Sequence, residues 1–345
     1  MARPLLSVII PVYKEKQRLA SFAISSALSQ TLDRSMYEVI VVSNVSLPEV
    51  KGVTVIESAN RWLGPKMAEG VTAASGDIVS FLEYDDLFYP NKLEQVLHHF
   101  ASHKDLAFYW NGQTFIGEDG RELAQKRSSK RSGARLIDLS RIKKGDLEAY
   151  EMIKKATWNA SSMSVRREVI AKYLPMLEQV KISGDSPLMV AAALSGGYAL
   201  VDEEPLTKFR VYPYRTDLEI EEAFIHDYLT MVRYLKECGS GNACVYLKNY
   251  YEYLYERSRL YYQFFSARRN KAEATRAFLG CIRHADSAID KGRALAVWSL
   301  SFLGSSASFK LYWKVGGGRL HVRIACSVWA AGHRAGVQAS IPPAA

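Results

Sequence analysis

Three carboxylates stand close together in the sequence, directly after an apolar run. Residues 78–83 predict a buried strand, and Glu83 at its end is followed by Asp85 and Asp86. In open α/β sheets, ligands bind beyond the carboxyl ends of the strands. Crowded carboxylates repel one another, and a hard divalent cation shared with substrate phosphates relieves that repulsion. The motif is equally typical of a solvated acidic turn before the helix predicted from Pro90, so both interpretations stay open.

A second group of candidate residues follows the first apolar run, residues 5–12. Pro11, Tyr13 and Glu15 stand where this predicted strand ends. An aromatic ring there can stack on a nucleobase, and a polar neighbour can bind the edge of the base. The alternative is a plain connection in which Glu15 stabilises the N-terminus of the next helix.

Two further segments lie at predicted helix starts. Asn60 and Lys66 flank Gly64-Pro65, where free N–H groups and the lysine could hold a phosphate, unless this is an ordinary turn. Asp185 precedes Ser186-Pro187. It could cap that helix, or it could act as a general base above a metal site.

The elements that position these residues alternate between strands and helices. This alternation predicts an α/β fold with a doubly wound, mostly parallel sheet flanked by helices. The expected strands are 5–12, 38–42, 52–57, 78–83 and 106–110, and the expected helices are 16–31, 65–74 and 90–100.

The pattern changes after residue 113. We expect a hairpin at 114–123, a mobile basic loop at 126–144, strands at 157–165, 198–201 and 206–211, and helices at 166–180 and 185–195. Long helical stretches dominate from about residue 217. The sequence therefore predicts a catalytic domain at 1–216 and a helical, basic C-terminal region at 217–345.

Composition and charge exclude several classes of protein. Of 345 residues, 48% are hydrophobic and 23% charged, which excludes general disorder, while 22 Gly and 4 Cys exclude collagen-like and disulfide-scaffold proteins. No signal peptide or spanning segment is visible, so we expect a cytoplasmic protein. The net charge of +9 belongs to the C-terminal part: from Arg257 onward there are 14 Lys/Arg and three Asp/Glu. The cysteines match no common metal site, and a Cys238–Cys244 bridge requires an oxidising or hyperthermophilic setting.

The order and spacing of these motifs resemble the family 2 glycosyltransferases, inverting enzymes of the GT-A fold. The resemblance covers about residues 5–215. It implies that Pro11, Tyr13 and Glu15 line the nucleotide base, and that Asn60 and Lys66 lie near the sugar nucleotide.

The acidic run resembles the family's D-x-D motif. The resemblance implies that Asp85 holds Mg²⁺ or Mn²⁺ against the diphosphate, with Glu83 in place of the usual first Asp and Asp86 as the third acidic residue. Asp185 matches the catalytic base, although Gly184 stands where Glu is usual. Asn44 replaces an Asp that usually contacts the base, which leaves uracil and guanine both open because an amide donates as well as accepts.

The resemblance implies transfer of a sugar from a UDP- or GDP-sugar to an acceptor hydroxyl with inversion, in assembly of a cell-surface or lipid-linked glycan. The alternative is a non-catalytic, nucleotide-sugar-binding partner subunit. The sequence argues against nucleic acid as a partner, since it lacks the usual motifs, and against a dinucleotide-dependent oxidoreductase, since no G-x-G-x-x-G follows the first strand.

The C-terminal region combines aromatic and basic residues. This composition suits peripheral binding to an anionic membrane surface on the cytoplasmic side, and a lipid-linked acceptor would fit it. The alternatives are a helical mini-domain core or the interface of a homo-oligomer.

Overall fold

The computed structural model describes residues 3–13, 17–123, 133–142, 146–212, 218–237, 242–266 and 270–302. Glu15, Cys238, residues 126–132 and 143–144 of the basic loop and the chain after Phe302 lie outside these ranges, and so do the predictions that depend on them.

The described strands form one nine-stranded mixed sheet in the order β3-β2-β1-β4-β8-β6-β9-β5, with β7 paired to β9. In the first half β3, β2, β1 and β4 are all parallel, as expected, whereas β8 runs antiparallel to β4 and β6. The bounds are β1 Leu6–Val12, β2 Tyr37–Ser43, β3 Val53–Glu57, β4 Ile78–Phe81, β5 Leu87–Phe88, β6 Leu106–Ile116, β7 Arg135–Asp138, β8 Met163–Arg166 and β9 Tyr198–Arg210.

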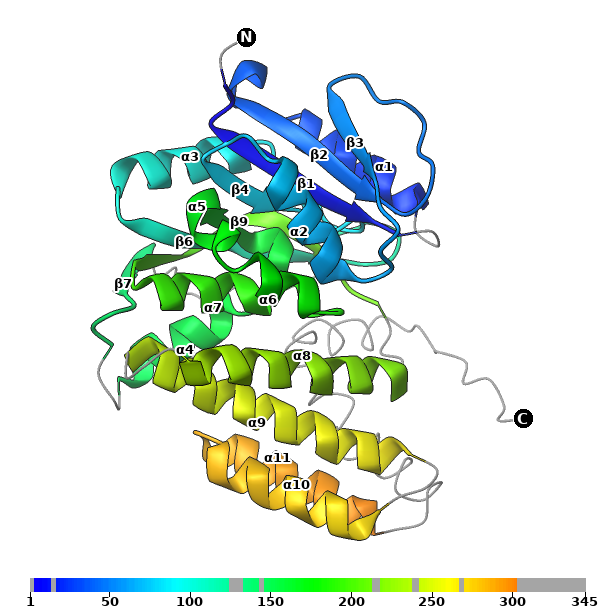
Figure 1. Ribbon diagram of the computed structural model, residues 1–345, viewed down its shortest axis with the longest axis vertical. Helices are drawn as coiled ribbons and strands as arrows, with labels where there is room; N and C mark the ends of the chain where they lie inside the picture. The colour runs from blue at the N-terminus through cyan, green and yellow to red at the C-terminus, as the bar shows by residue number, and fades with distance from the viewer. Residues whose placement is uncertain are drawn as a thin grey trace.

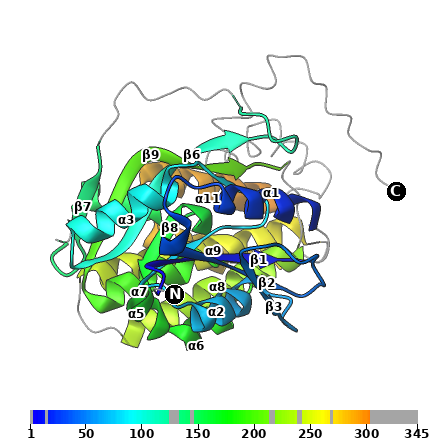
Figure 2. The same ribbon diagram turned by 90° about the horizontal axis from the view of Figure 1, so that it is seen from above.

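Helices cover both faces of the sheet because the strands are apolar on both faces. In β1, Val8 and Ile10 join one hydrophobic cluster, and Ile9 between them joins the other. Figure 2 shows α1 and α3 on one side of the sheet, and α2, α5 and α6 on the other. The bounds are α1 Gln17–Leu28, α2 Leu63–Ala73, α3 Lys92–Ser102, α4 Leu147–Ala156, α5 Arg167–Ala171, α6 Leu174–Gln179 and α7 Ser186–Ser195, with short 3₁₀ turns η2 Arg34–Met36 and η3 Ala160–Ser162.

The second half differs in detail from the predicted elements. Only the end of the expected strand at 157–165 is extended, because Ala160–Ser162 form η3 before β8 begins. The two short strands expected at 198–201 and 206–211 are one long strand, β9. Part of the expected mobile basic loop, Arg135–Asp138, is strand β7, which pairs antiparallel with β9. The expected hairpin at 114–123 is confirmed by an antiparallel bridge between Ile116 and Glu122.

The part of the C-terminal region that the structure describes, up to residue 302, is helical, as predicted. Its helices are α8 Leu218–Glu237, α9 Asn242–Phe265, α10 Lys271–His284 and α11 Ala288–Ser301. They are stacked in successive layers beneath α6 and α7 (Figure 1). None of the described helices is long and apolar enough to span a membrane.

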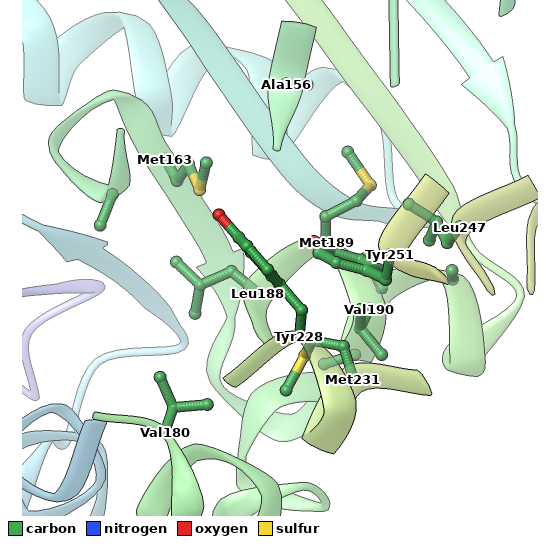
Figure 3. Packing of buried hydrophobic residues seen from close by; sticks show 14 of the residues in the cluster. Ala156, Met163, Val180, Leu188, Met189, Val190, Tyr228, Met231, Leu247 and Tyr251 are labelled. Atoms are coloured by element: carbon green, nitrogen blue, oxygen red, sulfur yellow. The ribbon is translucent and has the colours of Figure 1, made fainter. Parts of the chain in front are cut away.

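The hydrophobic core continues from the sheet into this helical region. Leu188 and Met189 of α7 belong to the same buried cluster as Met231 of α8 and Leu247 and Tyr251 of α9. Figure 3 shows these side chains gathered around α7. The helical region therefore packs directly behind the segment that begins with Asp185.

The cysteines differ in state. Cys244 of α9 is buried and disulfide-bonded. Cys281 of α10 is a buried free thiol.

Candidate functional site

Lys66 connects the ends of the first two strands. Its side chain is fully buried, and its Nζ donates to the Val12 carbonyl at 2.6 Å and to Asn44 Oδ1 at 2.9 Å. The ammonium also lies 3.9 Å from the centre of the Tyr13 ring, a cation–π contact. Lys66 thus joins the predicted base-binding residues Tyr13 and Asn44, while Pro11 lies buried within β1.

Asn44 follows β2 at the same edge of the sheet. Ser43 turns back to bind Val45, accepting from its backbone N–H at 3.2 Å and donating to its carbonyl at 2.8 Å. The hydrogen bond from Lys66 occupies one of the two lone pairs of Asn44 Oδ1.

Tyr13 also lies beside the acidic loop. Its ring contacts Tyr84 edge to face with 5.6 Å between ring centres. Burial, together with the charges of Glu83 and Asp85, raises the pKa of the Tyr13 hydroxyl. The structure therefore brings together the ends of β1, β2 and β4, as the parallel order predicts.

Two tyrosines bind Asp85. Burial raises the pKa of both Tyr84 and Tyr212, and a hydrogen bond to Asp85 adds to the shift in each. Arg210 at the end of β9 fixes the loop from behind, since its Nε donates to the Asp85 carbonyl at 2.8 Å. Asp85, 8% exposed, is held with its carboxylate among hydroxyl donors.

Asp86 points into the protein. Its Oδ1 accepts the backbone N–H of Arg210 at 2.8 Å, and burial, followed by the charge of Asp85, raises its pKa to about 8. Lys92, fully buried at the start of α3, donates to Thr207 Oγ1 at 3.0 Å and to the Ser161 carbonyl. Burial lowers the Lys92 pKa well below its usual range, and Asp86 opposes that shift. Asp86 and Lys92 therefore support the acidic loop from inside.

Glu83 and Asp185 come together although they are far apart in sequence. Burial raises the pKa of Glu83 well above its usual value, and the charges of Asp86, Asp85 and Asp185 raise it further. The acidic loop and Asp185 are therefore close enough for their charges to interact.

Asp185 caps α7 and keeps capacity to accept a proton. Its Oδ1 accepts from Ser186 N at 2.8 Å and its Oδ2 from Asn159 N at 3.0 Å. Burial is the main cause that raises its pKa to about 6, which the two backbone hydrogen bonds oppose. One lone pair remains on each oxygen, so capping and proton transfer are compatible.

Asn159 adopts an uncommon backbone conformation to make this contact. Its φ is +66°, and it is the one non-glycine residue with positive φ in the part of the chain that the structure describes. Its side chain donates to Gln113 Oε1 at 2.6 Å and accepts from Ser161 N at 3.0 Å. Asn tolerates this region better than most residues. Local strain at a carboxylate of raised pKa is typical of functional sites.

Close contacts with α2 explain why the residue before Asp185 is a glycine. A Cβ on Gly184 would lie 2.4 Å from Met67 Sδ and 2.7 Å from a Leu63 methyl, both on α2. Gly64 is equally confined, since its Cβ would lie 2.1 Å from the Leu177 carbonyl oxygen. The departure from the family pattern at Gly184 thus reflects the close approach of α2 to the Asp185 loop.

The donor set fits a hard cation held partly by substrate. Glu83, Asp85 and Asp86 offer only oxygen, and burial together with neighbouring carboxylate charges raises the pKa of Glu83 and of Asp86. The described residues contain no cluster of three ligands placed to hold an ion. This arrangement fits Mg²⁺ or Mn²⁺ bound by one or two carboxylates and completed by phosphate oxygens.

Other residues that matter here were not predicted. Tyr212, Arg210, Asn159 and Lys92 carry no motif in the sequence. Asn60, which was predicted near the donor, donates to Glu69 Oε1 at 2.5 Å on α2. Its role toward a ligand stays a prediction.

Comparison with known proteins agrees with this geometry. Residues 7–174 match the family described as Glycosyl transferase family 2. An uncharacterised glycosyltransferase of Rickettsia felis is 32% identical over 132 residues, 35% of this chain and 21% of that protein. The chain thus covers only about a fifth of that relative. One from Nostoc sp. is 25% identical over 288 residues, 74% of this chain and 84% of its own.

Solved structures show the same fold. Residues 1–349 of S. aureus TarS in complex with UDP-GlcNAc match with a TM-score of 0.55 and 13% identity, over 85% of this chain and 90% of that one. The mannosyltransferase PcManGT from Pyrobaculum calidifontis, in complex with GDP-Man and Mn²⁺, matches with a TM-score of 0.52 and 14% identity, over 95% and 88%.

Proposed function

Because residues 7–174 match the family described as Glycosyl transferase family 2, and the fold is that of solved glycosyltransferases, we propose that the protein transfers a sugar from a nucleoside diphosphate to an acceptor hydroxyl with inversion. The observation that carries the proposal is the placement of Asp185. A carboxylate with a pKa of about 6 lies in the same electrostatic environment as the acidic loop, beyond the carboxyl ends of β1, β2 and β4. Such a pKa suits a general base near neutral pH.

The donor would bind across the strand ends. Tyr13 and Asn44, joined by Lys66, would contact the base. We propose the same role for Pro11 and Glu15. Asn60 and Lys66 are proposed to lie along the donor toward its sugar. The relatives of known structure bind UDP-GlcNAc or GDP-Man, and a UDP- or GDP-sugar is the donor class we propose for this chain.

Asp85 is the proposed metal ligand, with Glu83 and Asp86 as the supporting acidic residues. A bound Mg²⁺ or Mn²⁺ would supply charge neutralisation for the departing diphosphate. The chain itself sets the position of Asp85, because Arg210 fixes its backbone and the two tyrosine hydroxyls orient its carboxylate.

The proposed reaction is a single displacement. The acceptor oxygen forms a bond to the anomeric carbon from the face opposite the diphosphate, and the carbon–oxygen bond to the diphosphate breaks. The acceptor proton passes to Asp185. Asn159 and Ser186 hold this carboxylate by backbone N–H groups, so the base is oriented before substrate arrives.

Replacement of Asp185 by Asn tests the proposal. Asn can still cap α7 through Oδ1, but its NH₂ would face the Asn159 N–H, so the free energy of unfolding should fall by about 1–3 kcal/mol. The base is lost, so kcat should fall by about 10²–10⁴ while the donor still binds. Turnover with a panel of UDP- and GDP-sugars, and donor-induced thermal shifts, measure the two effects. Near-normal turnover in a folded Asp185→Asn variant would refute the assignment of the base.

We also propose that the acceptor is a surface or lipid-linked glycan, reached by peripheral membrane association on the cytoplasmic side. Large apolar side chains are exposed on α10 and α11: Leu279 at 59%, Ile289 at 65% and Leu295 at 49%. Exposed Arg283 and Lys291 lie on the same helices. Apolar side chains next to basic ones favour anionic interfaces.

Sedimentation with vesicles tests this association. The protein should bind vesicles rich in phosphatidylserine and be released by high salt, and Leu279→Glu/Ile289→Glu should weaken binding. The membrane proposal would be wrong if neutral vesicles sedimented as much protein as anionic vesicles, or if neither kind sedimented any. The proposed catalytic function would not be affected.

A further inference from the structure

A carboxylate of the helical region binds the segment that leads into Asp185. Asp227 on α8 is fully buried, and it accepts three consecutive backbone N–H groups. Lys181 N donates to Oδ1 at 2.8 Å, and Ile182 N and Ser183 N donate to Oδ2 at 2.8 and 2.9 Å. His226 Nδ1 lies 3.1 Å from Oδ1 at the more exposed side.

Three backbone donors stabilise this buried carboxylate. Hydrogen bonds to an ionised acceptor are about twice as strong as those between neutral groups. A carboxylate so bound restricts the backbone of residues 181–183 more than one hydrogen bond between neutral groups would. Gly184 is then the one residue between this bound segment and Asp185.

The same segment is fixed from the opposite side by α2. Leu63 N donates to the Lys181 carbonyl at 2.8 Å, and Gly184 lies against Met67 and Leu63. α2 also carries Lys66, which joins the proposed base-binding residues. The segment before Asp185 is therefore held between a helix of the donor site and the first helix of the C-terminal region.

We propose that Asp227 is a positioning residue: by binding the backbone of residues 181–183, it places Asp185 for proton transfer and makes α8 part of the catalytic site. The inference rests on the proposed function of Asp185. A shift of about 1 Å in a reacting group can cost about 10²-fold in rate. Release of this segment should therefore slow the chemical step and leave donor binding in place.

Two substitutions of the full-length protein test the proposal in steps. Asp227→Asn keeps the size but presents an NH₂ to at least one backbone donor, and Asp227→Ala removes every acceptor. We expect kcat to fall by about 10-fold for Asn and by about 100-fold for Ala, with the donor KM within about 2-fold of wild type. Loss of folded protein alone would lower the active fraction and leave kcat per folded molecule unchanged.

Asp290→Asn is the matched control. Asp290 is another buried carboxylate of the helical region, and it binds Ser287, Lys154 and Arg293 and not the 181–183 segment. Its loss should lower stability and leave kcat per folded molecule unchanged. A folded Asp227→Ala enzyme with kcat within 2-fold of wild type would overturn the proposal.

Amide hydrogen exchange gives a readout that does not depend on activity. In the wild-type protein the amides of residues 181–183 should be strongly protected, and in Asp227→Asn their exchange should accelerate while that of β1 stays the same. Rapid exchange in the wild type overturns the proposal even if the variants fail to fold. If Asp185→Asn stays active while Asp227→Ala is slow, Asp185 is not the base. The effect of Asp227 on the rate would then act through the 181–183 segment on another group.

Discussion

At the scale of single residues, Asp185 combines a structural role with the proposed chemical one. It ends a loop, caps α7 and accepts a backbone N–H from Asn159, which itself has a left-handed backbone conformation. These contacts leave its pKa at about 6, because burial outweighs the two hydrogen bonds. The protonation of one carboxylate should therefore control turnover in mildly acidic solution.

The pH profile of kcat/KM follows from this pKa. Only ionised Asp185 can accept the acceptor proton, so kcat/KM should fall as pH decreases through about 6 and reach a plateau above about 7. Rates at fixed metal concentration from pH 4.5 to 8.5 measure it. The residual rate of Asp185→Asn should lack this limb. A limb near 4 would mean that the carboxylate is solvated in the working enzyme.

The sequence predicted the residues with distinctive neighbours and missed those that act through the backbone. Asp85 and Asp185 were found because they follow a buried strand and precede a helix. Asn159 contributes its N–H, which any residue except proline has. One feature of the sequence could have identified Asp227. It lies on the apolar face of α8 between Ala223 and Met231, where an acidic residue needs a buried partner.

At the scale of elements, α2 determines how closely the donor site and the Asp185 loop approach. Glycines make this contact possible: Gly64 faces the carbonyls of Leu177 and Val180, and Gly184 faces Met67 and Leu63 on α2. Side chains at these positions would push α2 away from the loop.

Gly64→Ala should destabilise the protein by about 1–3 kcal/mol, because its Cβ would overlap backbone oxygens that cannot move alone. Gly292→Ala is the control: a Cβ there meets nothing within 4 Å in the interior of α11, so stability should rise by about 0.5–1 kcal/mol. Urea unfolding of both variants measures the difference. Equal changes in the free energy of unfolding for the two variants would mean that α2 can move away from Leu177 and Val180 without loss of stability.

The parallel strands of the first half could be predicted from sequence more accurately than the strands of the second half. β1, β2 and β4 are short apolar runs separated by helices, a pattern with few alternatives. The long strand β9 contains Asp202, Glu203, Glu204 and Pro205, which favour a turn. It stays extended because it pairs with β6 through three register shifts and also pairs with β7 and β5.

At the scale of the whole molecule, the site concentrates uncompensated negative charge. The folded protein raises the pKa of Glu83, Asp86 and Asp185, so the folded state binds more protons than the unfolded chain between about pH 4 and 8. These carboxylates therefore contribute a loss of stability as pH rises through that window.

Divalent metal should reverse this loss. The rise in Tm produced by Mn²⁺ with UDP or GDP should be larger at pH 8 than at pH 5, because the cation competes with protons for the same oxygens. The difference between melts with metal and with chelator cancels titrations elsewhere. Asp85→Asn should reduce the effect. A metal shift equal at both pH values would mean that the ion does not bind at these carboxylates.

The buried contact between Asp227 and residues 181–183 also bears on how enzymes of this architecture can be recombined. An exchange of the helices after residue 217 between relatives would look harmless, because no predicted donor residue lies there. A graft that lacks a carboxylate opposite these amides should give a chimera that still recognises nucleotide and turns over slowly. Restoring one aspartate at the position of Asp227 should then recover activity, so the helical region and the catalytic loop would have to be inherited together.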